Sequence, residues 1–124
     1  MLLLNLKNSY VSGKIAEFIA RVYLRLHGFC IVSSRYIVGR GTNAGEVDII
    51  AKRGKLLIFV EVKKRETIDL AKEVIFAKQQ QRIIKSAEVF LSKYPRYAGF
   101  DCRFDAICFD KHYRFEYIKN AWIS

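Results

Sequence analysis

The sequence lacks the features that mark membrane, secreted and zinc-binding proteins. Its apolar runs are only as long as strands, so no segment is expected to span a bilayer. The leucines after Met1 are too few for a signal-peptide core and no basic residue precedes them. Cys30, Cys102 and Cys108 include no CxxC pair, which argues against a disulfide framework or a zinc site. We therefore expect a protein of the reducing cytoplasm whose cysteines are small buried residues.

Proline, repeats and linker-like segments are also scarce. The chain has a single proline in 124 residues and no low-complexity tract, which indicates regular structure joined by short turns. Hydrophobic residues make up 52% and charged residues 27%, as in a folded globular protein. This length predicts one domain, residues 1–124, with one sizeable core.

Acidic residues are outnumbered by basic ones. The chain has 22 Lys and Arg against 12 Asp and Glu, a formal net charge of +10. Such an excess attracts polyanions, and we favour nucleic acid over a charge that serves solubility alone. A membrane surface is less favoured, because no predicted helix pairs a basic face with a clean apolar one.

Hydrophobic periodicity predicts an α/β domain. A first helix is expected over 12–27, with Ser12 as N-cap and Gly28 after its end. A second helix is expected over 72–93. Strands are expected over 30–38, 46–52, 56–65, 102–109 and 114–122, in the order α-β-β-β-α-β-β. This order predicts a mixed five-stranded sheet flanked by helices. The expected core stripes are Ile15, Ile19, Val22 and Leu26 on the first helix, and Ile83, Ile84, Ala87, Phe90 and Leu91 on the second.

Acidic and basic side chains interrupt two of these apolar strands. Glu61 and Lys63 lie two residues apart in the run 56–63, and Glu46 and Asp48 lie two apart in the preceding strand. Because side chains alternate along a strand, each pair shares a face. If Gly54 and Lys55 form a two-residue hairpin turn, Asp48 faces Glu61 and Glu46 faces Lys63. A four-residue loop would pair Glu46 with Glu61 instead.

Two carboxylates facing each other repel, so their presence on a central strand needs a reason. A divalent cation such as Mg²⁺ or Mn²⁺ would relieve the repulsion, since hard metals prefer carboxylate oxygens. A salt-bridge ladder between Glu46 and Lys63 is the structural alternative, but it does not explain Asp48 beside Glu61. A carboxylate pair for glycoside hydrolysis is a weaker alternative, given the adjacent lysine and the basic chain.

At these motifs the chain resembles the YraN-like family of small bacterial proteins, in the PD-(D/E)XK superfamily that includes archaeal Holliday-junction resolvases. The resemblance implies a restriction-endonuclease-like fold and covers most of the chain. Val47 stands where the superfamily's name has proline. The residues that carry the resemblance are Gly45-Glu46-Val47-Asp48-Ile49-Ile50-Ala51, Phe59-Val60-Glu61-Val62-Lys63, Gly13, Glu17, Ala20, Tyr23-Leu24, Gly28 and Arg103-Phe104-Asp105.

The resemblance also implies roles for individual residues. Asp48, Glu61 and the Val62 carbonyl would bind the metal, and Lys63 would lie beside the attacking water. Glu46 would be a further ligand or support one. Products would carry 5′-phosphate and 3′-hydroxyl ends. In resolvase-like relatives a first-helix glutamate reaches the metal, which makes Glu17 a candidate. The predicted core stripe places Glu17 on the opposite side of the helix, which favours a solvated charge, but Ala16, Ala20 and Leu24 make that side partly apolar too, so another element could cover it.

Basic residues elsewhere predict a nucleic-acid-binding surface. Lys64 and Arg65 follow the strand that carries Glu61, and Lys78, Arg82 and Lys85 share a face of the expected second helix. Lys72 is expected to be solvated. Two further features stay open. One is a glycine-rich flap with Arg35 and Arg40, and the other is an Arg103–Asp105 pair that either forms an ion pair or borders the site.

The function predicted from the sequence is a metal-dependent nuclease that acts on DNA more readily than on RNA, with branched DNA as one candidate substrate. The alternative is a nucleic-acid-binding module that does not cut, or a subunit that needs a partner. A two-fold junction substrate would suit a homodimer, although no dimer surface is readable in the sequence.

Overall fold

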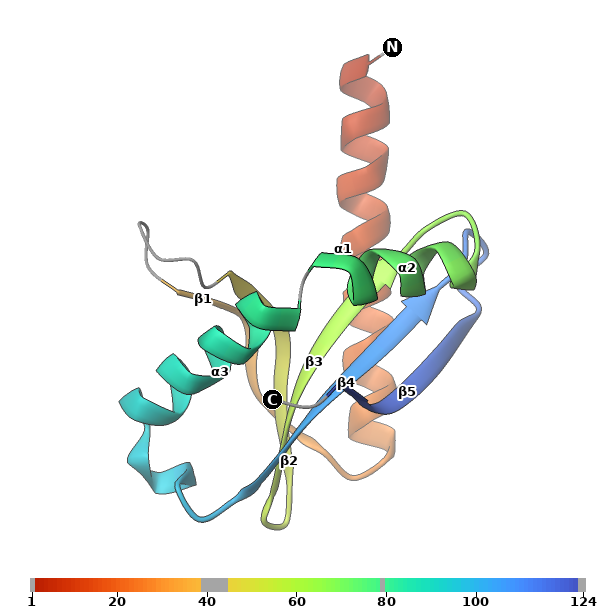
Figure 1. Cartoon of the computed structure of the whole chain (residues 1–124). Coiled ribbons are helices and arrows are strands. Elements are labelled where there is room, and N and C mark those ends of the chain that lie inside the picture. The colour runs from red at the N-terminus through yellow and green to blue at the C-terminus, as the bar shows by residue number, and fades with distance from the viewer. Residues whose placement is uncertain (1, 39–44, 79, 123–124) are drawn as a thin grey trace.

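The computed structural model describes residues 2–38, 45–78 and 80–122, with side chains from residue 8 onward except at 77 and 78. Its sheet has five strands in the order β1-β2-β3-β4-β5 (Figure 1). Strands β3 and β4 are parallel and the other neighbours are antiparallel. The mixed α/β sheet is therefore confirmed. The strands are β1 Cys30–Ile37, β2 Glu46–Arg53, β3 Leu56–Lys64, β4 Asp101–Phe109 and β5 Phe115–Trp122.

Helices cover both faces of the sheet. Helix α1 (Leu2–Leu26) lies on one face, and its N-terminal half extends beyond the sheet (Figure 1). Helices α2 (Ile68–Lys78) and α3 (Gln80–Lys93) connect β3 to β4 over the other face, and a short 3-10 helix (Pro95–Tyr97) follows them. The element order is α-β-β-β-α-α-β-β, consistent with a restriction-endonuclease-like fold. No helix in the described ranges is long and apolar enough to cross a membrane.

The prediction for α1 was wrong in two respects. The helix begins at Leu2, not after a cap at Ser12. Its buried face consists of Ala16, Ala20 and Leu24, which are fully buried against the sheet. Of the predicted stripe only Ile19 is partly buried, while Ile15, Val22 and Leu26 are exposed. Small residues at a spacing of four let the helix backbone approach the sheet closely. This close packing stabilises the fold more than burial of the larger apolar residues on the other side of the helix would.

The second predicted helix is two helices. Its core stripe is confirmed, because Ile83, Ala87 and Phe90 are buried and Ile84 and Leu91 pack against them. However, Lys78 is the last residue of α2, whereas Arg82 and Lys85 belong to α3. The four-and-three spacing therefore does not place the three on one helix face.

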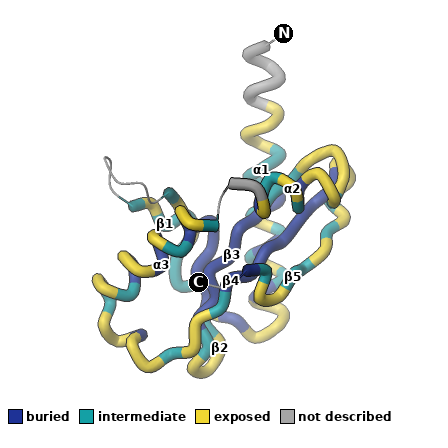
Figure 2. Tube along the Cα trace, viewed as in Figure 1, coloured by how far each residue is buried: buried dark blue, intermediate teal, exposed yellow. Residues whose placement is uncertain are grey.

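The central strands carry the core on both faces of the sheet (Figure 2). Residues such as Ile58 and Val60 of β3 pack beneath α1, and Phe59 packs beneath α3 against Phe90 and Phe104. Each such side chain contributes about 1.5–3 kcal/mol by leaving water. The cysteine prediction holds only for Cys108, since Cys30 and Cys102 are exposed.

Candidate active site

The sheet forks at the point where the predicted acidic residues lie. Strands β2 and β3 pair from Arg53 with Leu56 as far as Ile49 with Val60, which confirms the two-residue turn and excludes the four-residue loop. Beyond that point β2 stays paired with β1, and β3 stays paired with β4. Asp48 and Glu61, the next residue on each strand, therefore stand in the fork between two separating ladders.

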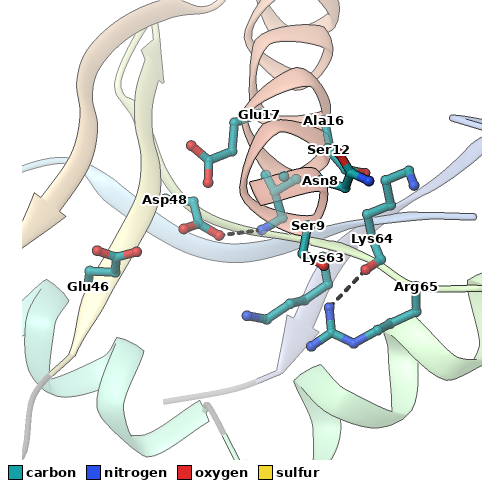
Figure 3. Close-up of a pocket in the computed structure, with 12 residues that line it drawn as sticks. Asn8, Ser9, Ser12, Ala16, Glu17, Glu46, Asp48, Lys63, Lys64 and Arg65 are labelled. Atoms are coloured by element: carbon teal, nitrogen blue, oxygen red, sulfur yellow. Dashed lines mark hydrogen bonds between the residues drawn. The ribbon is translucent and has the colours of Figure 1, made fainter. Parts of the chain in front are cut away.

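The two carboxyl groups are buried in contact with each other. Asp48 is 6% exposed and Glu61 is 4% exposed. The Val62 N–H donates a hydrogen bond to Asp48 Oδ2 at 2.8 Å (Figure 3). This bond spans the gap between β2 and β3 beyond their last paired residues. Burial, followed by the hydrogen bond and charge of Asp48, raises the pKa of Glu61 to about 10. The nearby Lys63 charge opposes this rise without cancelling it.

A cavity of about 680 Å³ opens above the fork. Glu46, Asp48 and Glu17 lie along one side of it, and Lys63, Lys64 and Arg65 continue from β3 on the other (Figure 3). Acidic groups next to basic ones at a cleft suit a substrate that carries phosphate beside a cation. The structure thus brings Glu46, Asp48, Glu61 and Lys63 together, as predicted from strand alternation.

Glu17 belongs to this cavity, contrary to the solvated position implied by the predicted core stripe. It lies one residue after the sheet-facing Ala16, and its side chain points toward Asp48 (Figure 3). Burial and the Asp48 charge raise the pKa of Glu17. Its Oε1 is 3.6 Å from the guanidinium of Arg35. Arg35 therefore contacts the site from β1, while Arg40, of the predicted flap, lies outside the described residues.

The basic side chains differ in what they contact. Lys64 Nζ lies 4.7 Å from the centre of the Tyr113 ring, and Arg65 donates a hydrogen bond to the Lys64 carbonyl. Arg82 packs against Gly45, next to Glu46. Ser86 donates a hydrogen bond to the Gly45 carbonyl and so fixes α3 at this edge. Lys85 is exposed on α3 and is not among the residues that line the cavity, and the backbone of Lys78 ends α2.

Two other predicted features have structural roles. Lys72 pairs with Glu116 at 2.9 Å. Arg103 and Asp105 form a bidentate ion pair away from the cavity, which settles the question left open by the sequence. Asp105 is fully buried and also accepts hydrogen bonds from the Tyr117 hydroxyl and from the backbone N–H of Asn120.

Sequence reasoning missed the wall that α1 adds to the site. The turns before Ala16 line the cavity with small or polar residues: Asn8, Ser9, Ser12 and Gly13. Their spacing continues the small stripe of Ala16 and Ala20 toward the N-terminus, and this signal was available in the sequence. Tyr113 was also missed; its hydroxyl donates to Ser12 Oγ at 3.4 Å and joins α1 to the β4–β5 turn.

The chemistry of the fork fits a hard divalent cation. Two buried carboxyl groups in contact, with Glu17 and Glu46 around them, make a site short of positive charge. The N–H and C=O of one strand residue point to the same side, so the Val62 carbonyl also points into the fork. Within the described ranges no group of three His, Cys, Asp or Glu side chains has metal-binding geometry. Two carboxylates and a carbonyl, with water completing the shell, are a donor set that a hard divalent cation accepts.

The mixed five-stranded sheet, forked between β2 and β3, belongs to an α/β domain whose topology is consistent with a restriction-endonuclease-like fold. The sequence agrees with this class at the level of family. Residues 16–109 match the model of the uncharacterised protein family UPF0102, and the chain belongs to this YraN-like family.

The chain is similar to family members from several bacteria. It is 43% identical to a UPF0102 protein of Paramagnetospirillum magneticum over 110 residues, which cover 89% of this chain and 85% of the relative. It is 44% identical to one from Acinetobacter baylyi, covering 79% and 69%, and 40% identical to one from Acinetobacter baumannii, covering 89% and 92%.

Proposed function

We propose that this chain is a metal-dependent nuclease that hydrolyses nucleic acid phosphodiesters at the sheet fork. The observation that carries the proposal is the buried contact of Asp48 with Glu61, in which Asp48 also lines a cavity shared with Lys63, Lys64 and Arg65. Packing alone does not favour two carboxyl groups in contact inside a sheet, so the arrangement points to chemistry.

In this proposal Asp48, Glu61 and the Val62 carbonyl hold Mg²⁺ or Mn²⁺. Val62 acts twice, because its N–H fixes the Asp48 carboxylate while its carbonyl faces the same gap. When bound, such an ion polarises a phosphoryl oxygen and lowers the pKa of water. Glu17 and Glu46 line the same cavity and add negative charge that favours a cation there.

Lys63 is the proposed catalytic cation. Its side chain lies in the cavity near Glu61, where an ammonium group orients an attacking water and stabilises the charge that grows on the phosphate. Lys64 and Arg65 extend the positive side of the cavity and would contact neighbouring phosphates without reading base sequence. Arg82, which packs against Gly45, would contact a nucleic acid strand that leaves the cavity past Glu46.

Cleavage assays on the full chain test the proposal. Labelled linear, flap and four-way-junction DNA, with matched RNA, are incubated with Mg²⁺, Mn²⁺ or EDTA. Asp48→Asn, Glu61→Gln and Lys63→Met should each lower the cleavage rate at least about a hundredfold, a loss typical of removed catalytic groups. Asp101→Asn and Lys55→Met provide matched controls at the hairpin end of the sheet, and they should cleave like wild type.

The alternative is a nucleic-acid-binding module on the same fold. It predicts salt-sensitive binding that needs no metal and is unchanged by Asp48→Asn. Metal-dependent cleavage that survives all three site substitutions after repurification would assign the activity to a contaminant and refute the proposal.

A further inference from the structure

Helix α1 exposes an apolar seam on the side away from the sheet. Val11, Ile15, Phe18 and Val22 follow one another at spacings of four, three and four residues, and each is at least 36% exposed. This is the a/d spacing of a coiled coil, a stripe narrower than the apolar face of a helix that packs on a globular core. We call these four residues the α1 seam; it lies opposite Ala16 and Ala20, which pack on the sheet.

The charges that flank the α1 seam are all basic. Lys14 Nζ lies 5.5 Å from the centre of the Tyr10 ring, and Arg21 lies 6.0 Å from that of Phe18. Arg25 follows one turn beyond Val22 and is exposed. In the described part of the chain none of the three forms an ion pair, and the only acid in α1, Glu17, faces the cavity.

These charges disfavour a second copy as the partner of the seam. With Ile15 and Val22 at a positions, Lys14 and Arg21 occupy g positions and Arg25 a d position. In an antiparallel pair of α1 helices, the g residues face each other and Lys14 meets the partner's Arg21. In a parallel pair, Arg25 meets its own copy at the seam. Both orientations bring like charges together with no acid to relieve them.

We propose that the α1 seam binds an acidic amphipathic helix of another protein. Apolar residues of that helix would interlock with Phe18 and its seam neighbours, and flanking Asp or Glu side chains would pair with Lys14, Arg21 and Arg25. The narrow a/d spacing fits a helix better than a lipid surface, which requires a wider apolar face. Because the opposite face of α1 lines the cavity, such a partner would bind on the far side of the helix from the candidate active site.

Binding of designed helical peptides to the full chain tests this inference, and the readout does not depend on catalysis. The probe is a fluorescent peptide of about four heptads with Leu at a and d and Glu at e and g; the mirror probe carries Lys at e and g. The acidic probe should bind at least about tenfold more tightly than the basic one, because only the acidic probe complements the charges on α1. Phe18→Ser should weaken its binding by a similar factor, whereas Val89→Ser, an exposed apolar residue on α3, should not change it.

Reversing the charges beside the α1 seam tests the proposed charge complementarity directly. The double variant Lys14→Glu/Arg21→Glu should prefer the basic probe, while thermal unfolding shows that the fold is intact. Equal binding of both probes by wild type, or no binding of either, overturns the proposal. Self-association of wild type that Phe18→Ser abolishes, measured by sedimentation, would instead assign the seam to a second copy. Phe18-dependent binding to phosphatidylglycerol vesicles without peptide binding would assign it to lipid.

Discussion

Replacing Glu61 by glutamine should stabilise the metal-free protein, although the residue is buried at the centre of the candidate site. The pKa of Glu61 lies near 10 in the fold, against an ordinary value of 4.5. Folding near neutral pH therefore requires this carboxyl group to take up a proton. Because the folded state binds more protons than the unfolded state between these two values, this contribution to stability falls as pH rises through that range.

The size of the effect follows from the proton uptake. At about pH 7.5, protonating a carboxyl group with an ordinary pKa of 4.5 costs about 4 kcal/mol of folding free energy. This cost does not depend on the exact pKa in the fold, as long as that pKa is well above the pH. Glutamine removes this cost and adds a smaller, pH-independent one, because its amide must find partners in the fork. Between about pH 5.5 and about pH 7.5 the advantage of the variant should grow by about 2.7 kcal/mol.

Urea unfolding of wild type and Glu61→Gln in EDTA, at several pH values, measures this difference. Asp48→Asn should show a weaker trend, because burial, the largest cause of the raised pKa of Glu61, remains in that variant. Glu88→Gln, on the exposed side of α3, should show no trend. A difference between Glu61→Gln and wild type that stays constant from pH 5.5 to pH 7.5, or reverses sign, would refute a buried neutral Glu61.

Three further predictions concern the frame around the site. Cys108 is buried and burial raises its pKa to about 11, so iodoacetamide near pH 8 should label exposed Cys30 and spare Cys108 until unfolding; equal labelling of both in the native protein would contradict its burial. Ala20→Leu should destabilise the fold by about 2 kcal/mol in urea unfolding, because no space separates α1 from the sheet; an unchanged midpoint would show that the helix can move outward. Asp105→Asn should cost about 3 kcal/mol by the same assay, since Arg103 loses its buried partner; a loss below about 1 kcal/mol would place the ion pair among weak surface pairs.

The sheet and the acidic pair were predictable because local rules determine them. Alternating side chains place Glu46 with Asp48 and Glu61 with Lys63 on shared faces, and the two-residue Gly-Lys turn was one of two hairpin options, the one that sets Asp48 beside Glu61. The structure follows that register as far as Val60. The fork itself was not predictable. It depends on β2 following β1 while β3 follows β4, a choice made by pairings between distant segments.

The orientation of α1 could not be obtained from residue size. Ile15 and Val22 are the larger apolar residues, but the sheet selects the side with Ala16 and Ala20 because small residues allow a closer approach. With the larger stripe taken as core, helix periodicity favoured a solvated Glu17, although Ala16, Ala20 and Leu24 marked its side as partly apolar and the family resemblance made it a site candidate. Two apolar stripes, one small and one large, were therefore readable on α1, but the sequence did not show which of them packs on the sheet.

Calorimetric titration of Mn²⁺ into wild type and Asp48→Asn, in two buffers with different ionisation enthalpies, tests whether the fork binds a metal ion. We expect saturable binding by wild type, with proton release because the ion displaces the proton held near Glu61. Binding should be lost in Asp48→Asn and retained in Asp101→Asn. Wild type that binds no metal, even with DNA present, or Asp48→Asn that binds it equally well, would contradict a metal centre at the fork and leave a nucleic-acid-binding domain.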